Sequence, residues 1–246
     1  MKNKKSLGQH WLKNRAILDE IAEVAGGGDL CIEIGPGLGT LTSSLLKRFS
    51  KVLAIEYDER LATNLPKSFP GKNLEVINTD ILDFDFNKIS QPYTVVGNIP
   101  YYITSPIIEK VLTAEKMPEK VVLLIQKEVA ERIVSDKETM LSLFVKNRAE
   151  AKLGELVKKE EFTPPPKVDS QVIILEPHKP VVSEVVFDLV RRGFAAPRKK
   201  LLHNLAGLKS RDELIKVFYK LNIDIDARPG DLSLIDWQGL FLAIYK

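Results

Sequence analysis

The residues most able to do chemistry stand in one short segment, Asn98-Ile99-Pro100-Tyr101. An amine on an aromatic ring is a poor nucleophile, because its lone pair is delocalised into the ring. Acceptors placed on its protons favour a pyramidal nitrogen, and the Asn98 side-chain oxygen and the Ile99 carbonyl suit that task. Pro100 would stiffen the turn, and Tyr101 would stack on a planar base. The same residue types also occur in ordinary Asn-Pro turns.

A glycine-rich turn follows the first predicted strand, in Glu33-Ile34-Gly35-Pro36-Gly37-Leu38-Gly39. Glycines at a strand-to-helix turn let the backbone approach a ligand closely. The spacing is GxGxG, unlike the GxGxxG of dinucleotide-binding proteins, and no GKS or GKT follows, which excludes a P-loop. Taken alone, the turn indicates either a nucleotide-like ligand or merely a tight turn.

Two acidic residues follow the next two predicted strands. Glu56 would accept hydrogen bonds from ribose hydroxyls, and Asp80 from the amino group of an adenine ring. Either one alone could be a solvated loop acid. Because the carboxyl ends of neighbouring parallel strands meet at one crevice, the glycine turn and both acids together predict a site for an adenosine-containing ligand.

An alternation of short apolar runs and amphipathic stretches must position these groups. It predicts buried parallel strands at Leu30–Ile34, Val52–Ile55, Leu74–Ile77, Thr94–Val96 and Val121–Ile125. Helices are predicted at Asn14–Val24, Leu41–Phe49, Glu59–Leu65 and Pro106–Leu112. This pattern is typical of a doubly wound α/β sheet. The strands predicted at Leu153–Val157 and Gln171–Leu175 leave no room for a crossover helix, so we expect this pair to be antiparallel.

The segment Glu176–Pro180 has the composition of a linker, and only helical patterns follow it. These predict helices at Val185–Ala196, Arg198–Leu205, Arg211–Lys220 and Trp237–Tyr245. We therefore expect two domains, residues 1–178 and a small all-helical domain of residues 179–246. From Val181 onward there are eleven Lys or Arg and eight Asp or Glu, whereas the preceding residues are balanced. The excess hints at a surface that faces a polyanion.

The composition excludes several classes of protein. The chain has 246 residues, 44% of them hydrophobic and 28% charged, as in a globular domain with a sizeable core. Its one cysteine, Cys31, allows no internal disulfide and suits a reducing compartment. The apolar runs are too short to span a bilayer, and no secretory signal is recognisable. The three histidines are scattered, so we expect no metal site. We also expect a cytoplasmic protein that acts as a monomer.

Several ordered motifs resemble those of the ribosomal RNA small-subunit adenine dimethyltransferases, the KsgA family. They are Ser6–Leu12, Glu33–Thr42, Glu56, Asp80, Asn98–Tyr101, Gln126–Arg132, Phe162, Pro165–Ser170, Arg198–Lys199 and Arg228–Ser233. The resemblance implies an α/β fold, a Rossmann-like seven-stranded class I methyltransferase sheet with a small helical C-terminal domain. It also implies S-adenosylmethionine as cofactor. The implied reaction is dimethylation of two adjacent adenines near the 3′ end of 16S rRNA, in the pre-30S subunit, with a role in ribosome biogenesis.

The resemblance also implies residue roles. The cofactor would contact His10, Leu12, Gly35, Gly37, Glu56, Asp80 and Asn98. The target base would be held by Asn98, Ile99, Pro100 and Tyr101, with Phe162 as a second stacking aromatic unless it is a core residue. RNA phosphates would be bound by Lys4, Lys5, Arg191, Arg192, Arg198, Lys199 and Lys200.

The chain departs from the family pattern at two places. His10-Trp11 stands where the family usually has Asn-Phe, and Pro197-Arg198-Lys199-Lys200 replaces an Arg-Arg-Lys-Thr run. The second change keeps the charge but loses the bidentate phosphate geometry of one guanidinium.

Three alternatives remain open. The first is the same chemistry on large-subunit rRNA, as in the erythromycin-resistance methyltransferases, which share Asn-Ile-Pro-Tyr. The second is a nicotinamide oxidoreductase, which the glycine spacing and the lack of an acid–base histidine disfavour. The third is a non-catalytic factor that only docks on the pre-ribosomal subunit.

Overall fold

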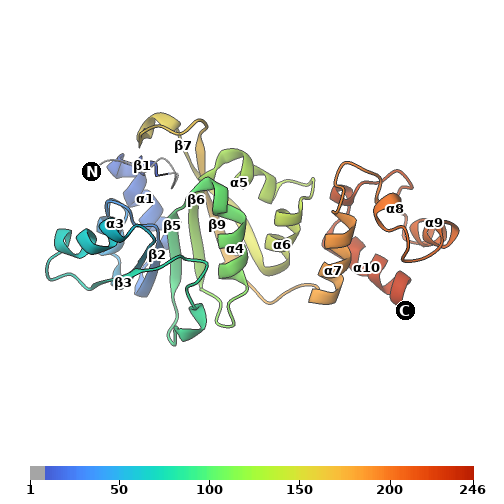
Figure 1. Ribbon diagram of the computed structural model, residues 1–246, viewed down its shortest axis with the longest axis horizontal. Helices are drawn as coiled ribbons and strands as arrows, with labels where there is room; N and C mark the ends of the chain where they lie inside the picture. The colour runs from blue at the N-terminus through green and yellow to red at the C-terminus, as the bar shows by residue number, and fades with distance from the viewer. Residues whose placement is uncertain (1–8) are drawn as a thin grey trace. The chain divides into compact units, whose positions relative to one another are not determined.

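The computed structural model describes residues 9–246, which divide into two compact units. The first unit comprises the chain up to Glu131 together with Ala149–His178. The second comprises Arg132–Arg148 and Lys179–Lys246. Figure 1 shows the elements of both units coloured along the chain.

Within residues 9–246, seven strands form the sheet of the first unit, in the order β4-β3-β2-β5-β6-β9-β7 (Figure 1). Their bounds are β2 (Gly28–Ile34), β3 (Phe49–Glu56), β4 (Leu74–Asn78), β5 (Thr94–Asn98), β6 (Lys120–Gln126), β7 (Ala149–Val157) and β9 (Ser170–Pro177). The first five are parallel, and β9 runs antiparallel to both β6 and β7. The predicted parallel strands and the predicted antiparallel pair are confirmed.

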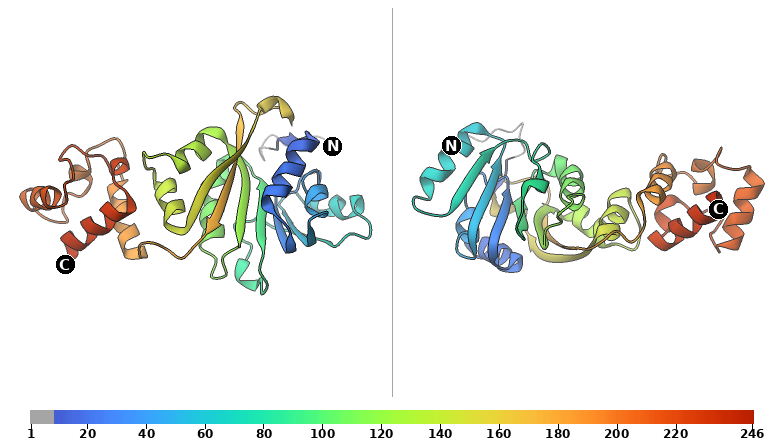
Figure 2. Two further views of the ribbon diagram at one scale, coloured as in Figure 1. Left: turned by 180° about the vertical axis from the view of Figure 1, so that it is seen from behind. Right: turned by 90° about the horizontal axis from the view of Figure 1, so that it is seen from below.

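Helices cover the sheet because its central strands are apolar on both faces. In β6, for example, Val121–Ile125 are at most 1% exposed. The helices of the first unit, seen from two further sides in Figure 2, are α1 (Arg15–Ala25), α2 (Thr42–Leu45), α3 (Glu59–Asn64) and α4 (Thr104–Leu112). Helix α5 (Lys127–Val134) begins in the first unit, and its residues from Arg132 onward belong to the second. Helix α1 begins where the Asn14 side chain accepts from the Ala16 N–H at 3.1 Å.

One predicted helix, Leu41–Phe49, is too long. Helix α2 ends at Leu45, and Phe49 already belongs to β3, where it pairs with Gly28 of β2. Pairing in the parallel sheet outweighs the helical periodicity of these residues. Helix α5 was not predicted.

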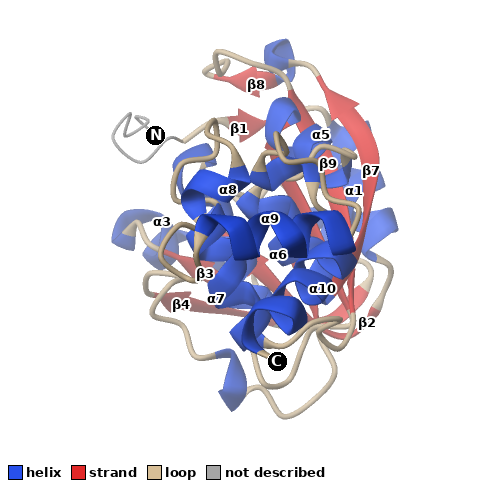
Figure 3. Ribbon diagram, turned by 90° about the vertical axis from the view of Figure 1, so that its right-hand side faces the viewer, coloured by secondary structure: helices blue, strands red, loops and turns tan. Residues whose placement is uncertain are grey.

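A second, two-stranded sheet ties the beginning of the described chain to a distant segment. Strand β1 (Trp11–Leu12) pairs antiparallel with β8 (Phe162–Thr163), as Figure 3 shows. In the register of this pair, Leu12 lies opposite Phe162. Both side chains are at most 2% exposed and belong to the hydrophobic core of the first unit. Their burial anchors the residues that precede and follow β1.

The second unit is helical. Its helices are α6 (Met140–Arg148), α7 (Glu184–Gly193), α8 (Leu201–Asn204), α9 (Arg211–Lys220) and α10 (Leu234–Tyr245). Helices α9 and α10 begin with capping boxes, Ser210 with Glu213 and Ser233 with Asp236. Helix α10 packs against α7 and α9 and buries Trp237 completely.

Helix α6 was not predicted, and the expected range 1–178 places it in the first domain. The structure groups it with the C-terminal helices. The physical reason is a buried pairing: Asn147 accepts from the Val182 N–H at 2.8 Å and donates to the Val182 carbonyl at 3.2 Å. The Phe144 ring also meets Phe187 edge to face. None of the helices within residues 9–246 combines the length and apolar character needed to cross a bilayer.

Candidate active site

A cavity of about 320 Å³ lies in the first unit, at the carboxyl ends of β2, β3 and β5. Parallel strands leave an opening at this edge, where their connections diverge. The structure brings to this cavity all seven residues expected at the cofactor and four of those expected at the base: His10, Leu12, Gly35, Gly37, Glu56, Asp80, Asn98, Ile99, Pro100 and Tyr101.

The glycine turn leaves room where a side chain would intrude. Gly37 has φ +60°, and a Cβ atom there would stand 3.2 Å from the Trp11 indole nitrogen. Its N–H donates to the Glu56 carboxylate at 3.0 Å. The turn therefore leaves a space beside Trp11, and its backbone is hydrogen-bonded to Glu56 at the end of the neighbouring strand β3.

Glu56 ends β3 and is 6% exposed. One carboxylate oxygen accepts from Gly37, and the other accepts from the Asp58 N–H at 2.8 Å. Burial raises the pKa of Glu56, and the backbone hydrogen bonds from Asp58 and Gly37 oppose that rise. Each oxygen keeps a further lone pair for an outside donor such as a hydroxyl.

Asp80 follows β4 and lines the same cavity. One of its oxygens accepts from the Leu82 N–H at 2.9 Å, which closes a short local turn. The carboxylate thereby keeps a defined position at the edge of the cavity.

A second buried carboxylate, Glu33, also lines the cavity, and we did not predict a role for it. It is 1% exposed and accepts from the Thr42 hydroxyl at 2.6 Å. Burial raises the pKa of Glu33 to about 8, the Thr42 hydrogen bond opposes the rise, and the charge of Glu56 adds to it. The sequence does contain a signal for this residue, since Glu33 is an acidic residue inside the apolar run Leu30–Ile34.

The Asn98 amide has a defined orientation. Its NH₂ group donates to the His10 carbonyl at 3.1 Å, which leaves the amide oxygen to accept from a ligand. Ile99 is buried, and its N–H lies 3.4 Å from the Leu124 carbonyl, in the neighbouring strand β6. The Asn98 amide is thus fixed at the end of β5, and Ile99 is anchored to the neighbouring strand β6.

Tyr101 and His10 form an aromatic edge to the cavity. Their rings are nearly parallel, 17° apart in plane, with centroids 6.3 Å apart. The Tyr101 hydroxyl shares a 2.6 Å hydrogen bond with Ser170, and burial raises the pKa of Tyr101. The His10 Nδ1 lies 2.8 Å from the Pro164 carbonyl, so Nδ1 carries the proton and Nε2 presents a lone pair when the ring is neutral.

Phe162 does not reach the cavity. It packs in the core with Leu12, 2% exposed, because strand pairing of β8 with β1 turns its side chain inward. Two other aromatic residues line the cavity and are well exposed, Tyr57 at 62% and Tyr102 at 64%. We did not predict a role for either, although each directly follows a predicted site residue, Glu56 and Tyr101.

The basic residues expected at RNA are in different situations. Lys4 and Lys5 lie outside the described residues. Arg191 pairs with Glu184 and Asp188, and Lys200 pairs with Asp226. Arg192 donates to the Ala206 carbonyl at 2.9 Å, and Lys199 lies 3.5 Å from His203. Arg198 lines a second cavity, inside the second unit. In residues 9–246, no cluster of His, Cys, Asp or Glu is suited to hold a metal.

A seven-stranded sheet of this order with an antiparallel β9, and a cavity at the ends of its central strands, defines a class I methyltransferase. Two solved structures share the fold over nearly the whole chain. A dimethyladenosine transferase from Plasmodium falciparum is 29% identical with a TM-score of 0.78, covering 95% of this chain and 96% of its own. The 23S rRNA methyltransferase ErmE is 27% identical with a TM-score of 0.77, covering 96% and 100%.

The chain belongs to the ribosomal RNA adenine dimethylase family, whose model matches residues 1–246, and is therefore an rRNA adenine dimethyltransferase. A relative from Dehalococcoides mccartyi, named ribosomal RNA small subunit methyltransferase A, is 39% identical over 98% of this chain and 88% of its own length. A relative of the same name from Clostridium acetobutylicum is 39% identical over 98% and 94%.

Proposed function

We propose that the chain uses S-adenosylmethionine to dimethylate the exocyclic amino groups of two adjacent adenines near the 3′ end of 16S rRNA. The observation that carries the proposal is the cavity that holds Asn98 and Ile99 beside the glycine turn, Glu56 and Asp80. The curated relatives carry names that specify the small subunit. The substrate would be the pre-30S subunit, in the cytoplasm, and the chain would act as a monomer.

The residues present fit this cofactor. The absent side chain at Gly37 leaves space beside Trp11, and the Glu56 oxygens retain lone pairs for ribose hydroxyls. Asp80 would accept from the adenine amino group. When bound, the cofactor supplies an electrophilic methyl group on a sulfonium. The buried Glu56 carboxylate would favour a cationic ligand.

The chain's own residues would prepare the nucleophile. The Asn98 amide oxygen and the Ile99 carbonyl would accept the two N–H protons of the target adenine, and Tyr101 would stack on its ring. These acceptors would hold the amino nitrogen with its lone pair directed at the donor's methyl group. The nitrogen then releases a proton to solvent. Because the acceptors are already oriented, little reorganisation accompanies the step.

The second unit would face the RNA. Its surface cations, Arg191, Arg192, Arg198, Lys199 and Lys200, would contact phosphates without reading sequence. Selectivity would then come from RNA shape and from a poorly stacked loop adenine, which is the least costly base to extrude.

The competing function is methylation of large-subunit RNA, because the chain is also similar to the 23S rRNA methyltransferase ErmE. The glycine turn at residues 35–39, the Gln126–Arg132 run and the Arg228–Ser233 segment favour the small-subunit family. Isolated small and large subunits should be incubated with the chain and labelled S-adenosylmethionine. We expect label only in small-subunit RNA, as dimethyladenosine by mass spectrometry. Label only in large-subunit RNA would reject the substrate assignment.

A further inference from the structure

The proline loop, residues 164–169, connects β8 to Ser170, the first residue of β9. It meets the aromatic edge of the methyltransferase cavity at both ends. At one end the Pro164 carbonyl lies 2.8 Å from His10 Nδ1, and at the other the Ser170 hydroxyl shares a 2.6 Å hydrogen bond with the Tyr101 hydroxyl. Although the structure describes the whole loop, neither it nor Ser170 lines the cavity. Any influence of this segment on the reaction must therefore pass through the two rings.

Ser170 has a fixed position in the sheet. It pairs with Gln126 of β6 on one side and with Val157 of β7 on the other. Its side chain is fully buried, with 0% exposed. Because close packing and pairing on both sides leave it little room to shift, the Ser170 hydroxyl is the stationary partner in its bond with Tyr101.

The residue before Ser170 closes the base of the proline loop. The Asp169 carboxylate accepts from the Lys158 ammonium at 2.9 Å and from the Lys159 N–H at 3.1 Å. The Asp169 carbonyl accepts from the Lys127 N–H at 3.1 Å. The hydrogen bond from Lys158 lowers the pKa of Asp169, so the carboxylate stays charged and keeps these bonds at neutral pH. The approach to Ser170 is thus held from two directions.

Tyr101 lies in a less constrained setting. It begins the short turn η4 (Tyr101–Ile103), is half-buried and lines the open cavity. Burial raises the pKa of Tyr101, which indicates that its hydroxyl is largely withdrawn from water. A phenol withdrawn from water needs a hydrogen-bond partner, and Ser170 supplies one.

The bond between the two hydroxyls determines where the Tyr101 ring points. Without the Ser170 hydroxyl, the Tyr101 hydroxyl would lose its partner, and an unsatisfied buried group costs more than the bond itself contributes. The hydroxyl could recover a partner by turning toward water in the cavity. That rotation would displace the ring face on which a base would stack. A phenylalanine at position 101 has no hydroxyl to satisfy and would keep the ring in place.

We propose that Ser170 is a positioning residue for the methyl transfer. By holding the Tyr101 hydroxyl, it fixes the ring on which the target adenine stacks, and through that ring the direction in which the amino nitrogen faces the donor's methyl group. A misplacement of about 1 Å can slow a reaction by about 10²-fold. The inference rests on the proposed function, in which Tyr101 stacks on the adenine, and extends the site to a residue outside the cavity.

The test compares three variants in single-turnover methyl transfer to unmethylated small subunits. Ser170→Ala should lower the rate constant about tenfold, because it leaves the Tyr101 hydroxyl unsatisfied. Tyr101→Phe removes the same bond without an orphaned phenol and should lower it about threefold. The double variant Ser170→Ala/Tyr101→Phe should also be about threefold slower than the unaltered chain, and therefore faster than Ser170→Ala. The KM for RNA should stay within about twofold, because phosphate contacts dominate RNA affinity.

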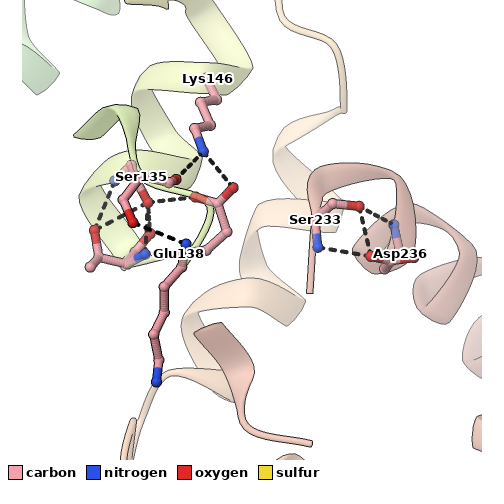
Figure 4. A network of polar contacts seen from close by, with 8 residues as sticks. Ser135, Glu138, Lys146, Ser233 and Asp236 are labelled. Carbon is pink, nitrogen blue, oxygen red and sulfur yellow. Dashed lines mark hydrogen bonds and ion pairs between the residues drawn. The ribbon is translucent and has the colours of Figure 1, made fainter. Parts of the chain in front are cut away.

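The matched control is Ser142→Ala, in the second unit. The Ser142 hydroxyl is also fully buried and also makes a 2.6 Å bond, which it donates to Glu138. Figure 4 shows Glu138 in a network with Ser135 and Lys146, in which Lys146 donates to both at 2.7 Å. Ser142→Ala removes a buried hydroxyl that does not line the cavity, so its rate constant should equal that of the unaltered chain.

A double variant no faster than Ser170→Ala would overturn the proposal, because Ser170 would then act by some route other than the Tyr101 hydroxyl. An unchanged rate constant for Ser170→Ala would also overturn it. So would loss of S-adenosylmethionine binding by Ser170→Ala, measured by calorimetry, since the residue would then act on the fold. Failure of the proposed function is read separately, as absence of methyl transfer from the unaltered chain.

Discussion

At the scale of single residues, Asn98 shows how the site is organised before substrate arrives. Its NH₂ group is bound to the His10 carbonyl, so its oxygen is the part of the amide left to accept. An acceptor oriented in advance stabilises a developing positive charge on nitrogen without reorganising at the moment of reaction. The His10 carbonyl therefore acts on the reaction through Asn98 and is a positioning group.

We predict that Asn98→Ala lowers kcat by about 10²–10³-fold, because one preorganised acceptor is lost. RNA affinity should stay within about twofold, since the phosphate contacts are elsewhere. Single-turnover methyl transfer and anisotropy measure the two quantities. The matched control is Asn73→Ala, which removes an amide that also donates to a backbone carbonyl, that of Ser50. Full activity of Asn98→Ala would refute the assignment.

Because Glu33 is buried, we predict that the free energy of unfolding depends on pH. Burial raises its pKa from 4.5 to about 8, so the folded chain retains a proton that the unfolded chain loses within that window. Its contribution to the free energy of unfolding therefore falls as the pH rises from 4.5 towards 8. Glu33→Gln keeps an acceptor for Thr42 but cannot titrate, so this decline should disappear in the variant.

Urea unfolding of both proteins between about pH 5 and about pH 8 measures the effect. The difference in free energy of unfolding should change by on the order of a few kcal/mol, with the unaltered chain losing stability relative to the variant. Glu20→Gln, at an exposed position of α1, is the control for loss of a carboxylate. Parallel pH curves for the chain and Glu33→Gln would contradict the prediction.

At the scale of elements, the short β1–β8 ladder ties the cavity-lining residues 9–12 to the distant segment around Phe162. It sets Leu12 and Phe162 face to face in the core and leaves His10, just before β1, to reach Asn98 and Pro164. A two-stranded ladder alone is marginal, so burial of these two side chains is what maintains it.

Phe162 is accordingly expected to act on stability. Phe162→Leu keeps an apolar side chain of lower volume, so we predict a loss of about 1 kcal/mol in the free energy of unfolding. The KM for small-subunit RNA should be unchanged. Thermal unfolding and steady-state methyl transfer measure the two. A tenfold rise in KM at unchanged stability would instead show that Phe162 stacks on the base, as the family resemblance implies.

At the scale of the whole molecule, the two compact units are not two consecutive stretches of chain. Helix α6 interrupts the sequence of the first unit. It packs on α7 through Phe144 and Phe187, Asn147 pairs with Val182 just before α7, and the chain then returns to form β7. The second unit therefore depends on both parts of the chain.

A chain ending at His178 should lose the structure of α6. Val182 and Phe187 would be absent, so the Asn147 amide would lose its buried partners and Phe144 its aromatic neighbour. We predict that amide hydrogen exchange in Met140–Arg148 becomes at least about tenfold faster, while exchange in β6 stays slow. Protection of α6 equal to that in the full chain would contradict this.

Strong local patterns made most of the sheet predictable. Buried β-branched runs such as those of β5 and β6 have few alternatives to a central parallel strand, and the short spacing between β7 and β9 requires an antiparallel pair. The end of α2 and the existence of α6 could not be predicted from local patterns, because the pairing of residues distant in sequence decides both. The candidate site was predictable where a residue ends a strand, as Glu56 and Asn98 do, or follows one closely, as Asp80 does.

The sequence by itself determined the alternation of strands and helices, the glycine turn and the acceptors that follow successive strands, because these depend on local periodicity and spacing. Only the tertiary structure decided that Phe162 is buried, that Glu33 is a buried carboxylate with a pKa of about 8, and that α6 joins the C-terminal helices. The reason is that burial, desolvation and the pairing of distant segments arise only when the chain is packed, so no local pattern records them.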